Sequence, residues 1–278
     1  MSCFWFYIVK RNKKRILSGL GVIRLYIGEE KYNNQGCLMQ IIECPKASCI
    51  VVEFQDRYKT KIYTTYNNFL KGSVKNLYYP SVYGVGIIGA KYPRSINKKM
   101  TKEYDTWIHM LQRCYDEKKK EKQPSYKDVT CCEEWLNYEN FYEWLHSQEN
   151  FEKWFNEKYW ALDKDIIVKN NKIYSPETCC LVPQNVNSLF VKRKAERGKY
   201  PIGVTYRNYG YIAKCNNPFT GKKEEIGWHN TSEGAFTWGY KPYKENIIKQ
   251  VAQIEHDKGN ITDKCYNAMM NYIVEIDD

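Results

Sequence analysis

Long apolar runs, paired CxxC motifs and an excess of acidic residues are all missing from this sequence. The apolar stretch at residues 3–9 (CFWFYIV) is far shorter than the roughly 20 residues that span a bilayer. Basic residues follow this stretch, whereas they precede the apolar part of a secretory signal. We therefore expect a cytoplasmic protein without a membrane partner. Without a CxxC…CxxC pattern, nothing in the spacing indicates a structural zinc site.

The charge balance is basic. Lysine and arginine number 43 against 32 aspartate and glutamate residues, which gives a formal net charge of +11. This excess indicates a polyanionic partner, with nucleic acid first and an anionic membrane surface second. A lysine-rich composition without a functional role is the alternative. Because 43% of the residues are hydrophobic and 15% are aromatic, global disorder is excluded, and 278 residues allow one large domain or two to three small ones.

The cysteine pattern indicates reduced thiols. Eleven is an odd number, and the neighbours Cys131-Cys132 and Cys179-Cys180 rarely bond to each other in such a sequence arrangement. The spacing also differs from a secreted disulfide framework. Cys114 and one member of each pair could converge with His109 on a zinc ion, but the spacing is not diagnostic. We expect these cysteines to pack as small apolar side chains, and we expect no zinc.

Hydrophobic periodicity changes along the chain and predicts an α+β fold. β-rich runs come first, a polar and basic stretch follows, helical periodicity comes next, and strand-like runs with further helices end the chain. We interpret these in order as a small N-terminal β domain, a basic linker, a helical plus ββα core, and a three-stranded sheet with helices. Their predicted bounds are residues 1–89, 90–103, 104–192 and 193–278.

The first two segments are predicted from turns and from the lack of an apolar period. Three β-rich runs separated by turn residues fit a small barrel or curled sheet of about five strands. They lie at residues 39–43, 50–54 and 58–65. The basic stretch contains Pro93 and is either a linker or an arm along a phosphate backbone, with Arg94, Lys98 and Lys99 as its candidate contacts.

Two apolar stripes with helical spacing lie in the third segment. They consist of Tyr104, Trp107, Ile108, Leu111 and Tyr115, and of Trp135, Tyr138, Phe141, Tyr142 and Leu145. In the last segment, Asn208-Tyr209-Gly210 predicts a hairpin turn between two strands. Thr231 or Ser232 is the predicted N-cap of a helix, and further helices are expected at residues 243–254 and 263–272.

Residues 84–89 (GVGIIG) match the GxGxxG pattern of dinucleotide-binding proteins in their letters only. In that motif a helix begins within the glycines, so that its N-terminus faces a pyrophosphate. Lys91, Tyr92 and Pro93 block a helix here, and no βαβ unit follows. We expect no nucleotide site.

Six short blocks in the third segment occur in an order typical of one family. They are WIHMLQRCY at 107–115, YKDVTCCEEW at 126–135, Phe141 with Trp144, LDKDI at 162–166, YSPETCC at 174–180 and PQNVNSL at 183–189. This ordered set resembles the HNH homing endonucleases of phages and mobile elements, over about residues 104–190. The resemblance implies a phage-type DNA-binding protein whose two short strands and helix surround one divalent ion, Mg²⁺ or Mn²⁺.

The resemblance also implies roles for single residues. Asp163 would be the metal carboxylate and Asn187 the helix ligand. Strand alternation puts Asp165 on the same face as Asp163, where it either helps to hold the metal or is only a salt-bridge partner. The family's general-base histidine would stand at position 164, which is Lys164 here. A lysine ammonium at its ordinary pKa cannot accept a proton at neutral pH, although it can contact a phosphate. His109 or His146 could act as base from elsewhere, but we expect both to be helix-surface or half-buried residues.

Two functional classes are compatible with these residues. Asp163 and Asn187 favour a metal-dependent endonuclease. Lys164 favours a non-catalytic protein that binds nucleic acid or a host nucleoprotein, such as a regulator or an anti-CRISPR inhibitor. A salt bridge from Lys164 to Asp163 would support the second class. The sequence defines neither the recognition site nor the oligomeric state.

The last segment has a resemblance of its own, carried by residues 203–207 (GVTYR), 210–214 (GYIAK), 226–227 and 231–240. It resembles an APETALA2-like DNA-binding domain, a three-stranded sheet backed by a helix that also occurs in phage homing endonucleases. The resemblance implies that the sheet enters the major groove of double-stranded DNA. Strand alternation puts neighbouring residues on opposite faces, so only some candidates can contact DNA; a solvated basic sheet is the alternative. The candidates are Tyr206, Arg207, Tyr209, Tyr211, Lys214, Lys222 and Lys223.

Overall fold

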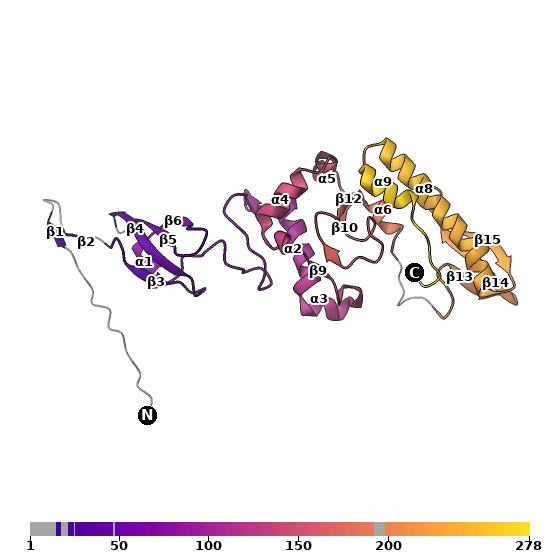
Figure 1. Ribbon diagram of the computed structural model, residues 1–278, viewed down its shortest axis with the longest axis horizontal. Coiled ribbons are helices and arrows are strands. Elements are labelled where there is room, and N and C mark those ends of the chain that lie inside the picture. Colours follow the sequence, from indigo (N-terminus) through magenta and orange to yellow (C-terminus); the bar gives the residue numbers. More distant parts are fainter. Residues whose placement is uncertain (1–14, 18–21, 25, 47, 192–197) are drawn as a thin grey trace, which may run out of the picture. The chain divides into compact units, whose positions relative to one another are not determined.

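The protein consists of two compact units, Met1–Ser81 with Ile87–Ala90 and Val82–Gly86 with Lys91–Asp278 (Figure 1). The computed structural model describes residues 15–17, 22–24, 26–46, 48–191 and 198–278. Helices and several small sheets are both present, which confirms the α+β class. The apolar stretch at residues 3–9 lies outside the described residues. Within the described residues, no helix is long and apolar enough to cross a membrane.

The first unit contains an antiparallel sheet in the order β3-β4-β5-β6. Its strands are Glu30–Tyr32, Leu38–Lys46, Cys49–Phe54 and Lys61–Thr64, and a separate ladder joins β1 (Arg15–Leu17) to β2 (Val22–Arg24). The described part of this sheet has four strands rather than the expected five or so. A short helix that the sequence did not predict, α1 (Tyr66–Leu70), follows β6 and packs Phe69 into the core of the sheet.

The predicted basic linker contains a short hairpin. β7 (Ser95–Ile96) pairs with β8 (Lys99–Met100) through Asn97 and Lys98, which both have positive φ. This conformation matches the two-residue turns of β-hairpins, whose twist suits the flanking strands. The hairpin is exposed and leads directly into the first central helix, so this stretch has a defined shape.

The first predicted apolar stripe lies on one central helix and the second on another, except that Trp135 lies in a 3₁₀ turn before it. α2 (Lys102–Tyr115) buries Trp107 and Leu111, and α4 (Tyr138–His146) buries Phe141 and Leu145. Thr101 caps α2 by accepting a hydrogen bond from the Tyr104 N–H. The smaller elements of this region are α3 (Glu117–Lys122), α5 (Phe151–Asn156), the 3₁₀ turns Pro124–Tyr126 and Glu134–Leu136, and the parallel pair β9 (Thr130–Cys131) and β11 (Ile173–Tyr174).

Within the glycine motif at residues 84–89, no helix forms, and Gly86 has a packing role. A Cβ atom on Gly86 would lie 2.6 Å from Leu111 Cδ1 and 3.0 Å from Trp107 Cη2. The backbone can therefore approach α2 this closely because residue 86 has no side chain.

Two strands and a helix follow α5. β10 (Trp160–Asp163) pairs antiparallel with β12 (Cys180–Pro183), in a register that sets Asp163 opposite Cys180. α6 (Gln184–Ser188) begins directly after β12. Asp163 is the last residue of β10, and residues 164–179 connect this strand to β12. α6 follows β12 and packs against β10.

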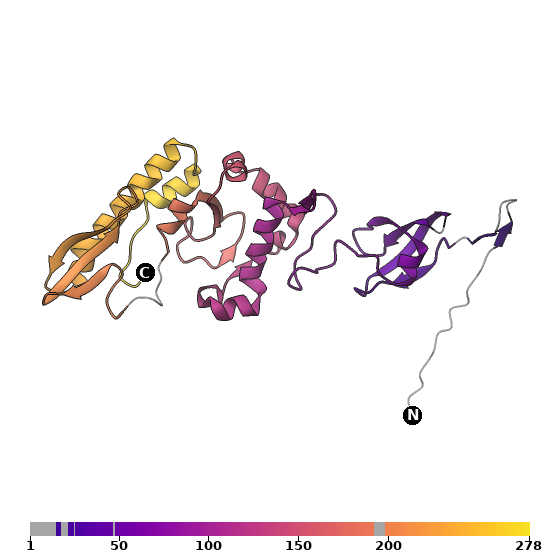
Figure 2. The same ribbon diagram turned by 180° about the vertical axis from the view of Figure 1, so that it is seen from behind.

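The C-terminal part is a three-stranded antiparallel sheet with helices. β13 (Val204–Arg207), β14 (Gly210–Asn216) and β15 (Lys223–His229) precede α7 (Ser232–Gly234), a π-helical segment (Ala235–Tyr240), α8 (Lys241–Asp257) and α9 (Asp263–Met270). α8 runs along the sheet in both views (Figures 1 and 2). Thr231, rather than Ser232, accepts the capping hydrogen bond from the Gly234 N–H. The π-helical segment makes the helices expected at 231 and 243 continuous.

Residues on both sides of position 192 share one hydrophobic core. Val182 on β12 and Val186 on α6 belong to the same buried cluster as Val204, Ile248 and Val251. Burial of these side chains links α6 to the C-terminal sheet and helices. The position of Asn187 on α6 therefore depends on packing with the C-terminal part of the chain.

Candidate functional site

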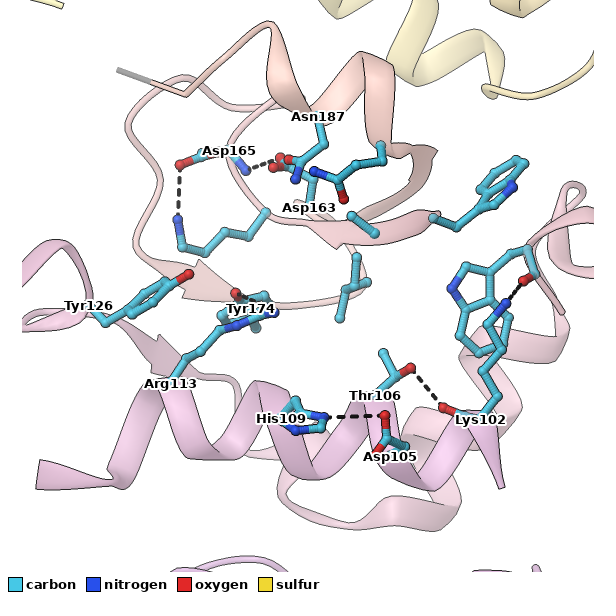
Figure 3. A pocket seen from close by; sticks show the side chains of 16 residues that line it. Lys102, Asp105, Thr106, His109, Arg113, Tyr126, Asp163, Asp165, Tyr174 and Asn187 are labelled. Atoms are coloured by element: carbon cyan, nitrogen blue, oxygen red, sulfur yellow. Dashed lines mark hydrogen bonds and ion pairs between the residues drawn. The ribbon is translucent and has the colours of Figure 1, made fainter. Parts of the chain in front are cut away.

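A cavity of about 560 Å³ lies in the second unit, and all three predicted metal-site residues line it. Asp163 at the end of β10 and Asn187 on α6 contribute to one wall (Figure 3). α2 contributes the opposite wall with Asp105, His109 and Arg113. The cavity therefore combines carboxylate, amide, imidazole and guanidinium groups from elements that are far apart in the sequence.

The Asp163 carboxylate is held in a defined orientation. Its Oδ1 accepts hydrogen bonds from the backbone N–H groups of Asp165 and Ile166, each at 2.8 Å. Burial, followed by the negative charge of Asp165, raises the pKa of Asp163 to about 6. Within the described residues, both hydrogen bonds found for this carboxylate go to Oδ1, and the nearby charge of Lys164 partly offsets the rise of the pKa. Figure 3 shows Asn187 projecting toward it.

Lys164 pairs with a different carboxylate from the one considered in the sequence analysis. Its Nζ lies 3.0 Å from Asp165 Oδ2 and donates to the Asn171 carbonyl oxygen at 3.1 Å. The ammonium also lies 5.9 Å from the Tyr174 ring centroid, and Lys164 is only 8% exposed. β10 ends at Asp163, so strand alternation does not extend to residue 165 and the Asp165 carboxylate is directed to Lys164. The predicted phosphate contact of Lys164 stays a prediction.

The donor set of Asp163 and Asn187 fits a divalent ion that is completed by water and phosphate oxygens. Mg²⁺ is commonly held by one or two carboxylates together with substrate phosphates and retained water. The negative charge of Asp165 beside Asp163 favours a positive charge at this point. No group of three or more His, Cys, Asp or Glu side chains in the described part of the chain is placed to hold a metal by itself.

The cysteines pack as apolar side chains. The ten cysteines within the described residues are free, and Cys114, Cys131, Cys179 and Cys180 are buried. Burial raises the pKa of Cys114 to about 12 and also raises the pKa of Cys131 and Cys179.

The two histidines considered as bases lie in different surroundings. His146 is half-buried, 3.3 Å from Glu103 Oε1, and stacks on Tyr142. His109 is an exposed residue of α2 whose Nδ1 lies 3.3 Å from Asp105 Oδ2, and both line the cavity. Sequence reasoning weighed His109 but missed Asp105. The i, i+4 spacing of Asp105 and His109, on the helix face away from the apolar stripe, was the available signal.

Other cavity residues were not predicted, and their contacts are mainly structural. The Lys102 ammonium donates to the carbonyl oxygens of Trp154 and Glu157 at the end of α5, so it caps that helix. Arg113 donates to the Tyr174 hydroxyl at 3.2 Å and lies 5.9 Å from the Tyr126 ring centroid. Arg113 therefore places a guanidinium on the α2 wall of the cavity, where Tyr174 and Tyr126 position it.

The candidate nucleic-acid contacts lie in two places. Arg94, Lys98 and Lys99 are exposed on the β7–β8 hairpin. On the C-terminal sheet, Arg207 and Lys214 both pair with Glu225, at 2.9 and 3.0 Å. Hydrogen bonding from Lys214 and the nearby charge of Arg207 lower the pKa of Glu225. These two cations therefore share a face of the sheet with a carboxylate between them.

Of the remaining sheet candidates, Lys223 shares this face with Glu225, and the others lie elsewhere on the sheet. Tyr206 lies opposite Tyr211 in the register, and their rings pack at 5.2 Å between centroids. Tyr209 is 95% exposed at the tip of the β13–β14 hairpin, with a φ of 61°. Lys222 and Lys223 are exposed at the start of β15. No family model, curated protein or solved structure matches this chain.

Proposed function

We propose that this protein is a metal-dependent nuclease that hydrolyses phosphodiester bonds in double-stranded DNA. The observation that carries the proposal is the meeting of Asp163 and Asn187 in one cavity, where both hydrogen bonds found for the Asp163 carboxylate within the described residues go to Oδ1. The net charge of +11 supports a nucleic-acid substrate. The resemblance to HNH endonucleases, read from the sequence, supports the same reaction.

Each residue of the site has a role that follows from its contacts. Asp163 and Asn187 would hold Mg²⁺ or Mn²⁺, and the two backbone N–H groups on Oδ1 keep the carboxylate oriented. When bound, the ion supplies positive charge that stabilises the phosphate during cleavage. Arg113 on the opposite wall adds a fixed positive charge near the substrate. Lys164 does not act as base, because its ammonium donates to Asp165 and Asn171.

Supercoiled plasmid tests the proposal directly. We expect nicked or linear products with purified protein in Mg²⁺ or Mn²⁺, and none in EDTA. A gel shift on the same DNA, measured at several salt concentrations, reports binding independently of cleavage. Binding without cleavage in either metal would reject the nuclease.

The second candidate is a non-catalytic protein that binds DNA or a host nucleoprotein. The observation that favours it is Lys164, whose buried ammonium stands where the family has its general base. In this case β10, β12 and α6 would act as a scaffold, and the basic residues of the β7–β8 hairpin and of the C-terminal sheet would supply the affinity for DNA. The plasmid experiment separates the two candidates, and a regulator or an anti-CRISPR inhibitor remains the prediction for the second.

Glu225→Gln is expected to strengthen DNA binding. The substitution removes the carboxylate that pairs with both Arg207 and Lys214, so these cations become available to phosphates. We expect affinity to rise by roughly 2- to 10-fold at low salt and the slope of log K against log salt to become steeper by about 0.9 for each added phosphate contact. Glu152→Gln, an exposed change on α5, is the matched control. Equal affinities for the two variants would exclude this face from the interface.

A further inference from the structure

We propose that His109 is the general base of this site and that Asp105 is its positioning residue. The inference rests on the proposed nuclease function and supplies the proton acceptor that Lys164 cannot provide. Nothing in the spacing of the family-like blocks assigns this role to α2. The assignment comes from the tertiary structure, which places α2 across the cavity from Asp163 and Asn187 (Figure 3).

The other three histidines do not line the cavity, and each lies in other surroundings. The chain has four histidines. His146 is engaged with the buried Glu103, His256 pairs with Asp263 on the C-terminal helices, and His229 packs beside Gly227 and Gly239. Since His109 is the one histidine among the residues that line the cavity, it is the imidazole that can reach water beside a bound phosphate.

Asp105 is placed to favour the tautomer of His109 that a base requires. Asp105 lies one helical turn earlier, and its Oδ2 is 3.3 Å from His109 Nδ1. In the proposed reaction the Asp105 carboxylate would accept the Nδ1–H, which would leave the lone pair on Nε2 free to take a proton. The side chains of both residues are about half exposed, at 54% and 53%, so the proton can leave to solvent. The buried residues Trp107 and Leu111 fix α2 and thereby the direction of this pair.

The proposed step is a hydrolysis. His109 Nε2 takes a proton from a water molecule, and the water oxygen forms a bond to phosphorus. The bond from phosphorus to the leaving nucleoside oxygen breaks, and that oxygen takes a proton from solvent. His109 then releases its proton to solvent. One water is consumed, one phosphodiester becomes a phosphomonoester and a hydroxyl, and no oxidant or reductant is needed.

His109→Ala tests the assignment in the full chain. We expect plasmid cleavage to slow by about 10²- to 10⁴-fold, the usual contribution of a general base. Mn²⁺ affinity, measured by electron paramagnetic resonance on the protein, and DNA affinity in a gel shift should stay unchanged. Added imidazole should restore part of the cleavage rate. His256→Ala is the matched control and should cleave at the wild-type rate.

Substitutions that remove or keep the carboxylate at position 105 test whether Asp105 positions His109. Asp105→Asn should slow cleavage by roughly 10- to 100-fold, as expected for a group that orients another, and Asp105→Glu should recover part of the loss. Recovery by the carboxylate variant is not expected if Asp105 has only a structural role on α2. If Asp105→Glu cleaves plasmid no faster than Asp105→Asn, the positioning role of Asp105 is overturned.

The outcomes separate this inference from the function on which it rests. A wild-type protein that binds but never cleaves DNA overturns both. Wild-type cleavage that persists in His109→Ala overturns the base assignment and leaves the nuclease standing. A loss of Mn²⁺ affinity in His109→Ala, without imidazole rescue, would make His109 a metal ligand and would also overturn its role as base.

Discussion

Asp163→Asn is expected to reduce plasmid cleavage by about 1000-fold while DNA binding is retained. The asparagine keeps an oxygen that can accept from the N–H groups of residues 165 and 166, but it removes the negative charge. Metal-assisted charge stabilisation contributes several kcal/mol, and about 1.4 kcal/mol corresponds to a tenfold change in rate. The measurement is the cleavage rate in Mg²⁺ and Mn²⁺ beside a gel shift.

Asp128→Asn is the control for this substitution, because Asp128 is an exposed aspartate outside the cavity. Circular dichroism would show that both variants keep their helices and strands. If Asp163→Asn and Asp128→Asn cleave at the same rate, Asp163 does not hold the ion and the site must lie elsewhere. A parallel loss of Mn²⁺ affinity in Asp163→Asn alone would tie the rate to the metal.

Trp107→Ala should destabilise the second unit by roughly 3–5 kcal/mol, the range for removing a large aromatic side chain from a core. Trp107 is fully buried, and its Nε1 donates to the Trp135 carbonyl oxygen at 2.7 Å. The alanine leaves a cavity between α2 and α4 and also leaves that carbonyl without its donor. Urea unfolding followed by tryptophan fluorescence measures the change, since seven of the eight tryptophans lie in this unit.

Trp238→Ala is the matched control, since the Trp238 side chain is 77% exposed. It should change the free energy of unfolding by no more than about 0.5 kcal/mol, as surface substitutions usually do. A similar destabilisation by the two substitutions would contradict the packing described for α2. Because α2 carries Asp105, His109 and Arg113, Trp107→Ala should also lower any cleavage activity at temperatures where the unit starts to unfold.

The sequence predicted local structure well where periodicity was strong. The stripe around Trp107 and Leu111 became one buried helix face, and the Asn208-Tyr209 turn joined two paired strands. Predictions failed where neighbours in space decide the structure. Helix α1 forms by packing Phe69 on a sheet, and the basic stretch with Asn97 and Lys98 forms a hairpin despite its lack of apolar period.

The candidate site shows the same division. Asp163 and Asn187 could be found from the sequence, because the short blocks around them occur in a typical order. Asp165 was assigned to the same strand face, but β10 ends at Asp163 and Lys164 binds the Asp165 carboxylate instead. Strand alternation holds only inside a strand, so it could not describe a residue in the following turn.

The sequence by itself determined the α+β class, the longer helices α2, α4, α8 and α9 of the second unit, and the types of residue that line the cavity. Only the tertiary structure decided which of these residues meet. Asp105 and His109 lie 58 and 54 residues before Asp163 in the chain. They line one cavity with it because buried tryptophan and leucine side chains fix α2. Periodicity reports which face of an element is buried, whereas the distance between two elements depends on how their buried faces pack.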